Sequence, residues 1–282
     1  MITARLRFLV ASEQTPVYYA SESGENAQLD MQGQFEEVEV EIENGRPEQA
    51  GYTLDKEGFQ LVAHTSAVTN FYNTEQITDI YNREVQKLVM EATGAYKVYV
   101  FDHTHRADSE SQRAQRNSRE PSNIVHNDYT DKSARQRIID LLPANEVDEL
   151  LNRRFAIVNV WRAIDHPAET SQLALCDSTS LKADSGIAVE RRAKDRIGEL
   201  MMANFDKANR WFYFPSMGPE EVLLLKTYDS DTEGRTGFCL HTAFEHPNPP
   251  VGAKPRESLE TRAFAFFNQT PDLAQRGGRN RR

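Results

Sequence analysis

The second half of the chain is a series of short predicted β-strands with no long helical pattern between them, and this restricts the folds available to it. Apolar and aromatic runs of strand length are separated by turn-forming residues. The predicted strands cover residues 155–161, 173–176, 210–214, 221–228, 238–244 and 259–267. Many short strands of this kind imply two packed sheets or a barrel, so we expect a mainly β fold.

The first half of the chain adds flanking elements. Val38, Val40 and Ile42 alternate with glutamates, and this period of two predicts a half-buried strand. From residue 74 to about 91, apolar residues recur every three or four positions, which predicts an amphipathic helix packed on a sheet, with Thr74 as its N-cap and Gly94 as its stop. Further predicted elements are a strand at 96–101 and short helices at 133–142 and 145–151.

Two segments have weaker patterns. Residues 106–122 are polar and lack periodicity, so we expect an exposed loop that could close over a nearby site. Residues 198–204 fit a helix or a strand, and the turn-like residues 206–209 before Trp211 favour a hairpin.

Composition and charge exclude several classes of protein. The 282 residues are 39% hydrophobic and 27% charged, as is usual for a soluble globular protein, and their net charge of −10 argues against a nucleic-acid partner. Two cysteines are too few for a disulfide framework, and the chain has no run of apolar residues long enough to span a membrane. We therefore expect a cytoplasmic protein without a membrane partner, whose basic tail is a frayed terminus. The sequence gives no sign of the oligomeric state.

His126-Asn127-Asp128, with His241 far along the chain, forms a candidate metal site. Alternate residues of a strand share a face, so His126 and Asp128 would point the same way, and a second histidine from a distant strand would complete three ligands. Such a facial triad leaves open positions on an octahedral ion, which suits Fe(II) holding a bidentate co-substrate and dioxygen. The alternative is that these are ordinary polar residues of core and turns.

A candidate carboxylate clamp follows His241. Arg256 supplies a guanidinium fork and Ser258 a hydroxyl, which together could receive the two oxygens of a co-substrate carboxylate. Glu260 and Arg262 fall on the same strand face by parity. Arg262 could therefore be the fork instead, or Glu260 could neutralise one of the arginines.

Four other residues are candidates for contact with the substrate or for supporting the site. They are Arg162, Tyr213, Lys226 and Tyr228. An arginine at the end of a core strand is more often a rim residue, and alternating aromatic residues on a sheet are more often core than pocket.

Six ordered blocks of sequence resemble the hydroxylase/desaturase family of fungal and bacterial secondary metabolism. The blocks are His126-Asn127-Asp128-Tyr129-Thr130, Asn159-Val160-Trp161-Arg162, Trp211-Phe212-Tyr213-Phe214-Pro215-Ser216-Met217, Lys226-Thr227-Tyr228-Asp229-Ser230, His241-Thr242-Ala243-Phe244 and Arg256-Glu257-Ser258-Leu259-Glu260-Thr261-Arg262. The resemblance covers roughly residues 95–268.

The resemblance implies a non-haem Fe(II)/2-oxoglutarate oxygenase that hydroxylates or desaturates a small molecule such as a secondary metabolite, with dioxygen as the oxidant. His126, Asp128 and His241 would bind iron, and Arg256 with Ser258 would bind the distal carboxylate of 2-oxoglutarate. The alternatives are a methyltransferase-type enzyme and a non-catalytic β-cup that binds a ligand.

The expected fold is a double-stranded β-helix, a cupin-like jelly roll with flanking helices, on which the resemblance and the metal motif agree. We expect one oxygenase domain over residues 1–282. Residues 1–95 would give N-terminal strands and a helix, 96–268 the double-stranded β-helix, and 269–282 a tail.

Overall fold

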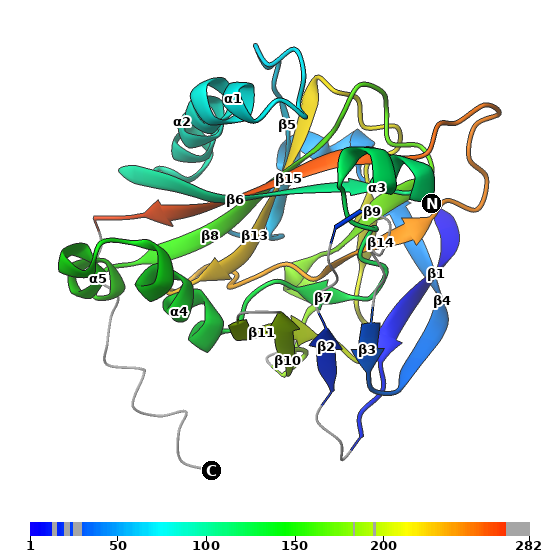
Figure 1. Cartoon of the computed structure of the whole chain (residues 1–282). Coiled ribbons are helices and arrows are strands. Elements are labelled where there is room, and N and C mark those ends of the chain that lie inside the picture. Colours follow the sequence, from blue (N-terminus) through cyan, green and yellow to red (C-terminus); the bar gives the residue numbers. More distant parts are fainter. Residues whose placement is uncertain (13–15, 20–22, 25–29, 183, 194–195, 269–282) are drawn as a thin grey trace.

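Two facing β-sheets form the centre of the molecule (Figure 1). The computed structural model describes residues 1–12, 16–19, 23–24, 30–182, 184–193 and 196–268, and the expected tail lies outside them. The sheets meet through apolar side chains from both, with Leu175 and Phe212 on one sheet and Trp161 and Leu223 on the other. The predicted mainly β fold is confirmed.

The larger sheet has ten strands. In spatial order they are β1 (Ile2–Leu9), β4 (Phe35–Asn44), β12 (Trp211–Tyr213), β9 (Ser171–Cys176), β14 (His241–Glu245), β7 (His126–Asn127), β11 (Arg196–Met202), β10 (Ile187–Ala193), β2 (Val17–Tyr19) and β3 (Asp30–Gln32). Most neighbours are antiparallel, and the parallel pairs are β12 with β4 and β10 with β2. This order places the two-residue strand β7 beside β14.

The smaller sheet has five antiparallel strands. Their order is β5 (Phe59–Ala63), β13 (Glu221–Asp229), β8 (Phe155–Ala163), β15 (Glu257–Phe266) and β6 (Lys97–Ala107). Strands β8 and β15 lie inside this sheet and are buried along nearly their whole length. One face of these strands therefore packs against the larger sheet, and another element must pack on the opposite face.

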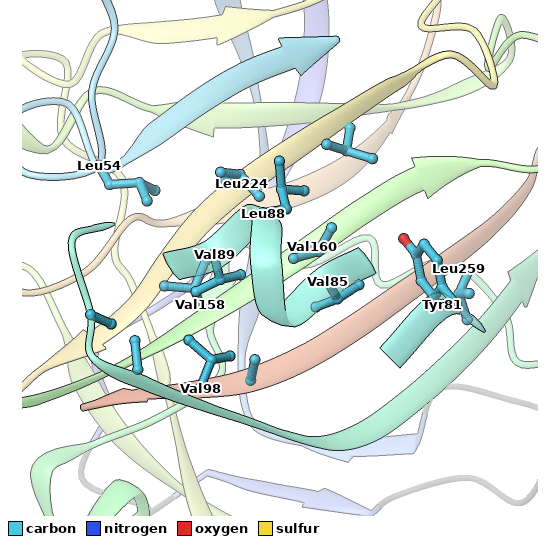
Figure 2. Close-up of a cluster of buried hydrophobic side chains, with 14 of the residues drawn as sticks. Leu54, Tyr81, Val85, Leu88, Val89, Val98, Val158, Val160, Leu224 and Leu259 are labelled. Atoms are coloured by element: carbon cyan, nitrogen blue, oxygen red, sulfur yellow. The ribbon is translucent and has the colours of Figure 1, made fainter. Parts of the chain in front are cut away.

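A helical segment covers that outer face (Figure 2). It consists of α1 (Thr74–Gln76), a π-helical turn (Ile77–Tyr81) and α2 (Asn82–Thr93). Figure 2 shows Val85, Leu88 and Val89 of α2 above strand residues that include Val158 and Val160. The apolar spacing seen in the sequence thus produces the predicted packing on a sheet.

The ends of this helical segment have clear causes. The Asn73 side chain accepts a hydrogen bond from the Gln76 amide, so Asn73, rather than the predicted Thr74, caps the helix. At the other end Gly94 adopts a φ of 72°, a left-handed conformation that favours glycine, and the helix stops there as predicted.

Two more helices pack at one end of the smaller sheet, α4 (Asp131–Leu141) and α5 (Ala144–Leu151). Figure 1 shows them beside the ends of β8 and β15, and Ile138 and Leu150 pack there against Phe155 and Phe266. Thr130 caps α4 by accepting a hydrogen bond from the Ser133 amide. Helix α4 thus starts immediately after the His126 segment and fixes where that segment ends.

The structure corrects the predicted loop at 106–122. Strand β6 continues to Ala107, and a short helix, α3 (Glu110–Arg116), follows with Ser109 as its cap. None of the α3 residues is buried, so the helix has no apolar stripe that a periodicity search could find.

The predicted hairpin between residues 198–204 and the strand at Trp211 is wrong, although residues 198–202 lie in a strand. Strand β11 pairs antiparallel with the preceding strand β10, not with β12. The short 3₁₀ turns Arg46–Gly51 and Ser178–Ser180 complete the description. Within the part of the chain described here, no helix combines the length and apolar character needed to cross a membrane.

Candidate metal centre

Three side chains with metal-binding atoms meet between β7 and β14. His126 and His241 are direct cross-strand partners, so their rings share a face and their centroids lie 4.4 Å apart. Asp128 follows two residues after His126, and one ligand atom from each of the three residues lies within 4.8 Å of the others. The structure therefore brings together the triad that the sequence predicted.

Both imidazoles are oriented by backbone carbonyls. Nδ1 of His126 lies 2.7 Å from the Ile124 carbonyl oxygen, and Nδ1 of His241 lies 3.1 Å from that of Cys239. A nitrogen facing a carbonyl must carry the proton, which leaves Nε2 of each ring as a free electron-pair donor. Burial lowers the pKa of His126 to about 3, so this ring is neutral at physiological pH.

Asp128 presents one oxygen to the site. Its Oδ2 accepts hydrogen bonds from Asn159 Nδ2 at 2.8 Å and from Arg262 Nε at 2.9 Å. Its Oδ1 lies 3.7 Å from Nε2 of His126. Burial, the largest single effect, would raise the pKa of Asp128, but the Arg262 guanidinium together with the two histidines and the Asn159 hydrogen bond outweighs it and holds this pKa well below its usual range.

Arg262 acts as a support for Asp128. Its guanidinium also donates to Asp102 Oδ2 at 2.6 Å, to Thr104 Oγ1 at 3.0 Å and to Glu260. A guanidinium already bound to three carboxylates has little capacity left for the carboxylate of a co-substrate. These contacts favour Arg256 over Arg262 as the clamp.

The sequence reasoning missed Asn159. This side chain is fully buried in the middle of β8, between apolar neighbours. A buried amide needs hydrogen-bond partners, and Asn159 has them in Asp128 and Thr227. An asparagine inside an otherwise apolar core strand was the available signal.

Arg256 and Ser258 are buried, each only 1% exposed. Arg256 Nη1 donates to the Ser171 carbonyl oxygen at 2.5 Å, and the guanidinium lies 5.7 Å from the centre of the Trp161 ring. Among the described residues, neither Arg256 Nε nor Ser258 Oγ has a hydrogen-bond partner. Burial lowers the pKa of Arg256 to about 10, so it remains a cation at neutral pH.

The candidate clamp residues and the triad are connected along two neighbouring strands. Arg262 pairs with Asn159, and Glu260 pairs with Trp161, in the register of β15 and β8. Ser258 lies four residues before Arg262 on the same face, a separation of about 13 Å along a strand. A polar strip therefore runs along β15 from the carboxylate of Asp128 to two unpaired donors.

Two of the other predicted residues lie away from this strip. Arg162 points to the outer face of the smaller sheet, where its guanidinium lies 4.3 Å from the Phe71 ring centre and 5.5 Å from that of Tyr81. Lys226 is in a buried ion pair with Asp229, 3.0 Å from Nζ to Oδ2. Both residues serve the packing of the fold.

The two predicted tyrosines also serve packing. Tyr213 contacts Phe244 with ring centres 5.7 Å apart, within a buried apolar cluster that also contains residues of β1 and β4. Tyr228 packs on Phe155 and donates to Asp131 at the start of α4. The alternation of side chains along a strand predicted which residues share a face. It could not predict which face is the inner one, nor the register shift between Lys226 and Tyr228, because both depend on how the sheets assemble.

A cavity of about 420 Å³ lies next to the triad. His126, Asp128 and Arg262 contribute to its wall, together with residues of β6, β10 and β11. A ligand in this cavity would therefore lie beside two residues of the triad.

The chain has clear relatives. The family model described as an oxidoreductase/YMDC permease-like domain matches residues 6–266. The chain is 30% identical over 258 residues to the hydroxylase/desaturase CTB9 of Cercospora beticola, covering 84% of this chain and 79% of that protein. It is 27% identical over 235 residues to the Fe(II)/2-oxoglutarate-dependent dioxygenase nvfI of Aspergillus novofumigatus, covering 80% of this chain and 82% of the relative.

A solved structure shares the fold. The iron and alpha-ketoglutarate-dependent endoperoxidase NvfI superposes with a TM-score of 0.81 at 24% identity, covering 94% of this chain and 98% of the other. This likeness confirms the predicted double-stranded β-helix with flanking helices.

Proposed function

Because the chain belongs to the hydroxylase/desaturase family of oxidoreductases, we propose that it is an Fe(II)/2-oxoglutarate-dependent oxygenase acting on a small molecule. The observation that carries this proposal is the geometry of the triad, in which two carbonyl-anchored imidazoles and one carboxylate oxygen face a common point. The substrate would be hydroxylated or desaturated, and the relatives suggest a secondary metabolite.

The donor set fits Fe(II). Two neutral imidazole nitrogens and one carboxylate oxygen on one side of the ion are the ligands typical of non-haem Fe(II) oxygenases, with positions left open for co-substrate and dioxygen. When bound, Fe(II) with 2-oxoglutarate and dioxygen supplies the oxidising chemistry. The contacts of Asn159 and Arg262 to Asp128 Oδ2 would leave the other oxygen, Oδ1, available to bind the ion.

Arg256 and Ser258 would hold the distal carboxylate of 2-oxoglutarate. Their unpaired donors lie in a buried environment, where a carboxylate would receive charge-assisted hydrogen bonds in little competition with water. The remaining residues of the cup position the reactants and exclude solvent.

We also propose that residues 1–282 belong to one oxygenase domain. Strands β1 and β4 from the first 95 residues join the sheet that carries the triad, and β5 joins the sheet that carries the clamp. These pairings support a single unit for substrate binding and chemistry.

The proposed function is tested by anaerobic binding and by turnover. We expect the protein to bind Fe(II) and 2-oxoglutarate and to form succinate with uptake of dioxygen only when both are present. A protein that binds neither would be a non-catalytic β-cup. A protein that binds S-adenosylmethionine instead would support the methyltransferase-type alternative.

Asn159→Ala is expected to weaken Fe(II) binding about 10- to 100-fold, the usual cost of losing a group that orients a metal ligand. The Asp128 Oδ2 atom would lose one of its two hydrogen bonds and the carboxylate could rotate. Anaerobic Fe(II) titration measures the effect, and Asn152→Ala at the exposed end of α5 is the control. Equal Fe(II) affinities in the two variants would show that Asn159 does not support metal binding.

A further inference from the structure

The cavity beside the triad is lined by an unusual number of arginines. They are Arg106, Arg119, Arg137, Arg191, Arg196 and Arg262, and the carboxylates in the same wall are Asp102, Asp128 and Glu199. Among the described residues of this wall, six cations against three anions leave an excess of three positive charges. The chain as a whole has a net charge of −10, so this excess is specific to the cavity.

The carboxylates of the wall already have partners. Asp102 and Asp128 are bound by Arg262, and Glu199 is bound by Lys132. Arg106, Arg119 and Arg191, which we call the arginine cluster, have no carboxylate of the described residues within 4.0 Å. The charge of this cluster is therefore not neutralised by that part of the protein.

Backbone hydrogen bonds hold two segments of the arginine cluster side by side. Arg106 at the end of β6 and Arg119 after α3 form a bridge, in which the Arg119 amide donates to the His105 carbonyl and the Ala107 amide to the Arg119 carbonyl, both at 2.9 Å. Arg191 comes from β10, where its guanidinium lies 5.8 Å from the centre of the Tyr18 ring. Three guanidinium groups from separate segments thus line one cavity.

Holding these cations together has an electrostatic cost. Burial and then the charges of Arg106 and Arg191 lower the pKa of Arg119. Burial also lowers the pKa of Arg191, and the charges of Arg196 and Arg262 add to that effect. Like charges partly removed from water repel each other, and a bound anion would relieve the repulsion.

We propose that the substrate carries an oxyanion, a carboxylate or a phosphate, which the arginine cluster binds through Arg119 and Arg191. The inference rests on the proposed function, because it assigns this cavity to the substrate of that site. A guanidinium fork matches the paired oxygens of either group.

The metal and the co-substrate do not account for the excess charge. Fe(II) brings two positive charges and 2-oxoglutarate two negative ones, so together they leave the three excess charges of the cavity unchanged. The co-substrate also has its own unpaired donors in Arg256 and Ser258. With no carboxylate of the described residues paired to it, the arginine cluster is suited to an anionic substrate.

The test is binding of small probes to protein loaded anaerobically with Fe(II) and saturating 2-oxoglutarate, so that the co-substrate site is filled. The probes are 3-phenylpropanoate, phenyl phosphate and the neutral 3-phenylpropanamide, and equilibrium dialysis gives their affinities. We expect at least one anion to bind about tenfold or more tightly than the amide, in line with charge-assisted hydrogen bonds. The tighter anion identifies the carboxylate or the phosphate as the preferred group.

Variants assign the binding to the arginine cluster. Arg119→Gln and Arg191→Gln are each expected to weaken the preferred anion about tenfold, with the amide unchanged. Arg153→Gln on the surface beside Glu149 removes the same charge elsewhere and should change neither. Ligand-free Arg119→Gln should also unfold at a higher temperature than the parent, because repulsion within the cluster falls.

Three results would overturn the inference: equal binding of anions and amide, equal loss in Arg153→Gln, or loss of 2-oxoglutarate affinity in Arg119→Gln with probe binding intact. The last result would make the arginine cluster part of the co-substrate site. Fe(II) and 2-oxoglutarate binding are measured first and without probe. Failure of that step counts against the proposed function, whereas failure of the probe step counts against the anionic substrate alone.

Discussion

Asp128→Ala is expected to lower the Fe(II) affinity at least about a hundredfold, since even groups that only orient a metal ligand contribute 10- to 100-fold. The substitution removes the one anionic ligand of the triad and leaves two neutral imidazoles. Succinate formation that depends on Fe(II) should fall to background. Anaerobic titration with Fe(II), followed by a turnover assay at saturating 2-oxoglutarate, measures both effects.

The fold should survive this substitution. Arg262 would lose Asp128 but keep its contacts with Asp102 and Glu260, so no unpaired cation is left in the wall. Asp79→Ala, an exposed position in the π-helical turn, is the matched control and should bind Fe(II) as the parent does. Parent-like Fe(II) affinity and turnover in Asp128→Ala would remove Asp128 from the metal site.

The triad could be predicted from the sequence because two of its three ligands, His126 and Asp128, lie close together in the chain. The spacing of two predicted that His126 and Asp128 point the same way, although the strand itself ends at Asn127, and the apolar run around His241 marked a second strand. The direct pairing of His126 with His241 is a property of the assembled sheet and could not be predicted. A two-residue strand such as β7 leaves no periodic pattern of its own.

The supporting residues depend on register, which the sequence does not encode locally. Asn159 reaches Asp128 only because β8 lies beside β15 with Asn159 opposite Arg262. Parity predicted that Arg256, Ser258 and Arg262 share a face, but the contacts that separate a clamp from a support come from β6 and β9. Long-range pairing of this kind is fixed only once both sheets are packed.

Arg162 illustrates the same limit for a single strand. Strand β8 is buried on both faces, so its apolar pattern does not tell which face meets the other sheet and which meets the helices. Asn159 and Trp161 point to the cup interior, whereas Arg162 points to Phe71 and Tyr81 under the helical cover. A family block can therefore mix residues of the site with residues of the core.

Arg256→Lys is expected to raise the KM for 2-oxoglutarate about 10- to 100-fold, because a single ammonium cannot reproduce the two parallel hydrogen bonds of a guanidinium fork. Arg262→Lys should instead weaken Fe(II) binding, since Arg262 holds Asp128 Oδ2. Measuring the KM for 2-oxoglutarate and the Fe(II) affinity in both variants separates the two roles. A larger rise in the 2-oxoglutarate KM for Arg262→Lys would show that Arg262, and not Arg256, binds the co-substrate carboxylate.

The lysine at position 256 should also make 2-oxoglutarate binding depend on pH. Burial lowers the pKa of Arg256 to about 10, and the same environment would lower the pKa of a lysine there, which starts from a lower reference value than that of arginine. The lysine is cationic below its lowered pKa and loses its charge as the pH rises through it, so the KM of Arg256→Lys should increase from pH 7 to pH 9 while that of the parent stays nearly constant. A KM for Arg256→Lys that is flat over this range would show that position 256 does not carry the charge that binds the co-substrate.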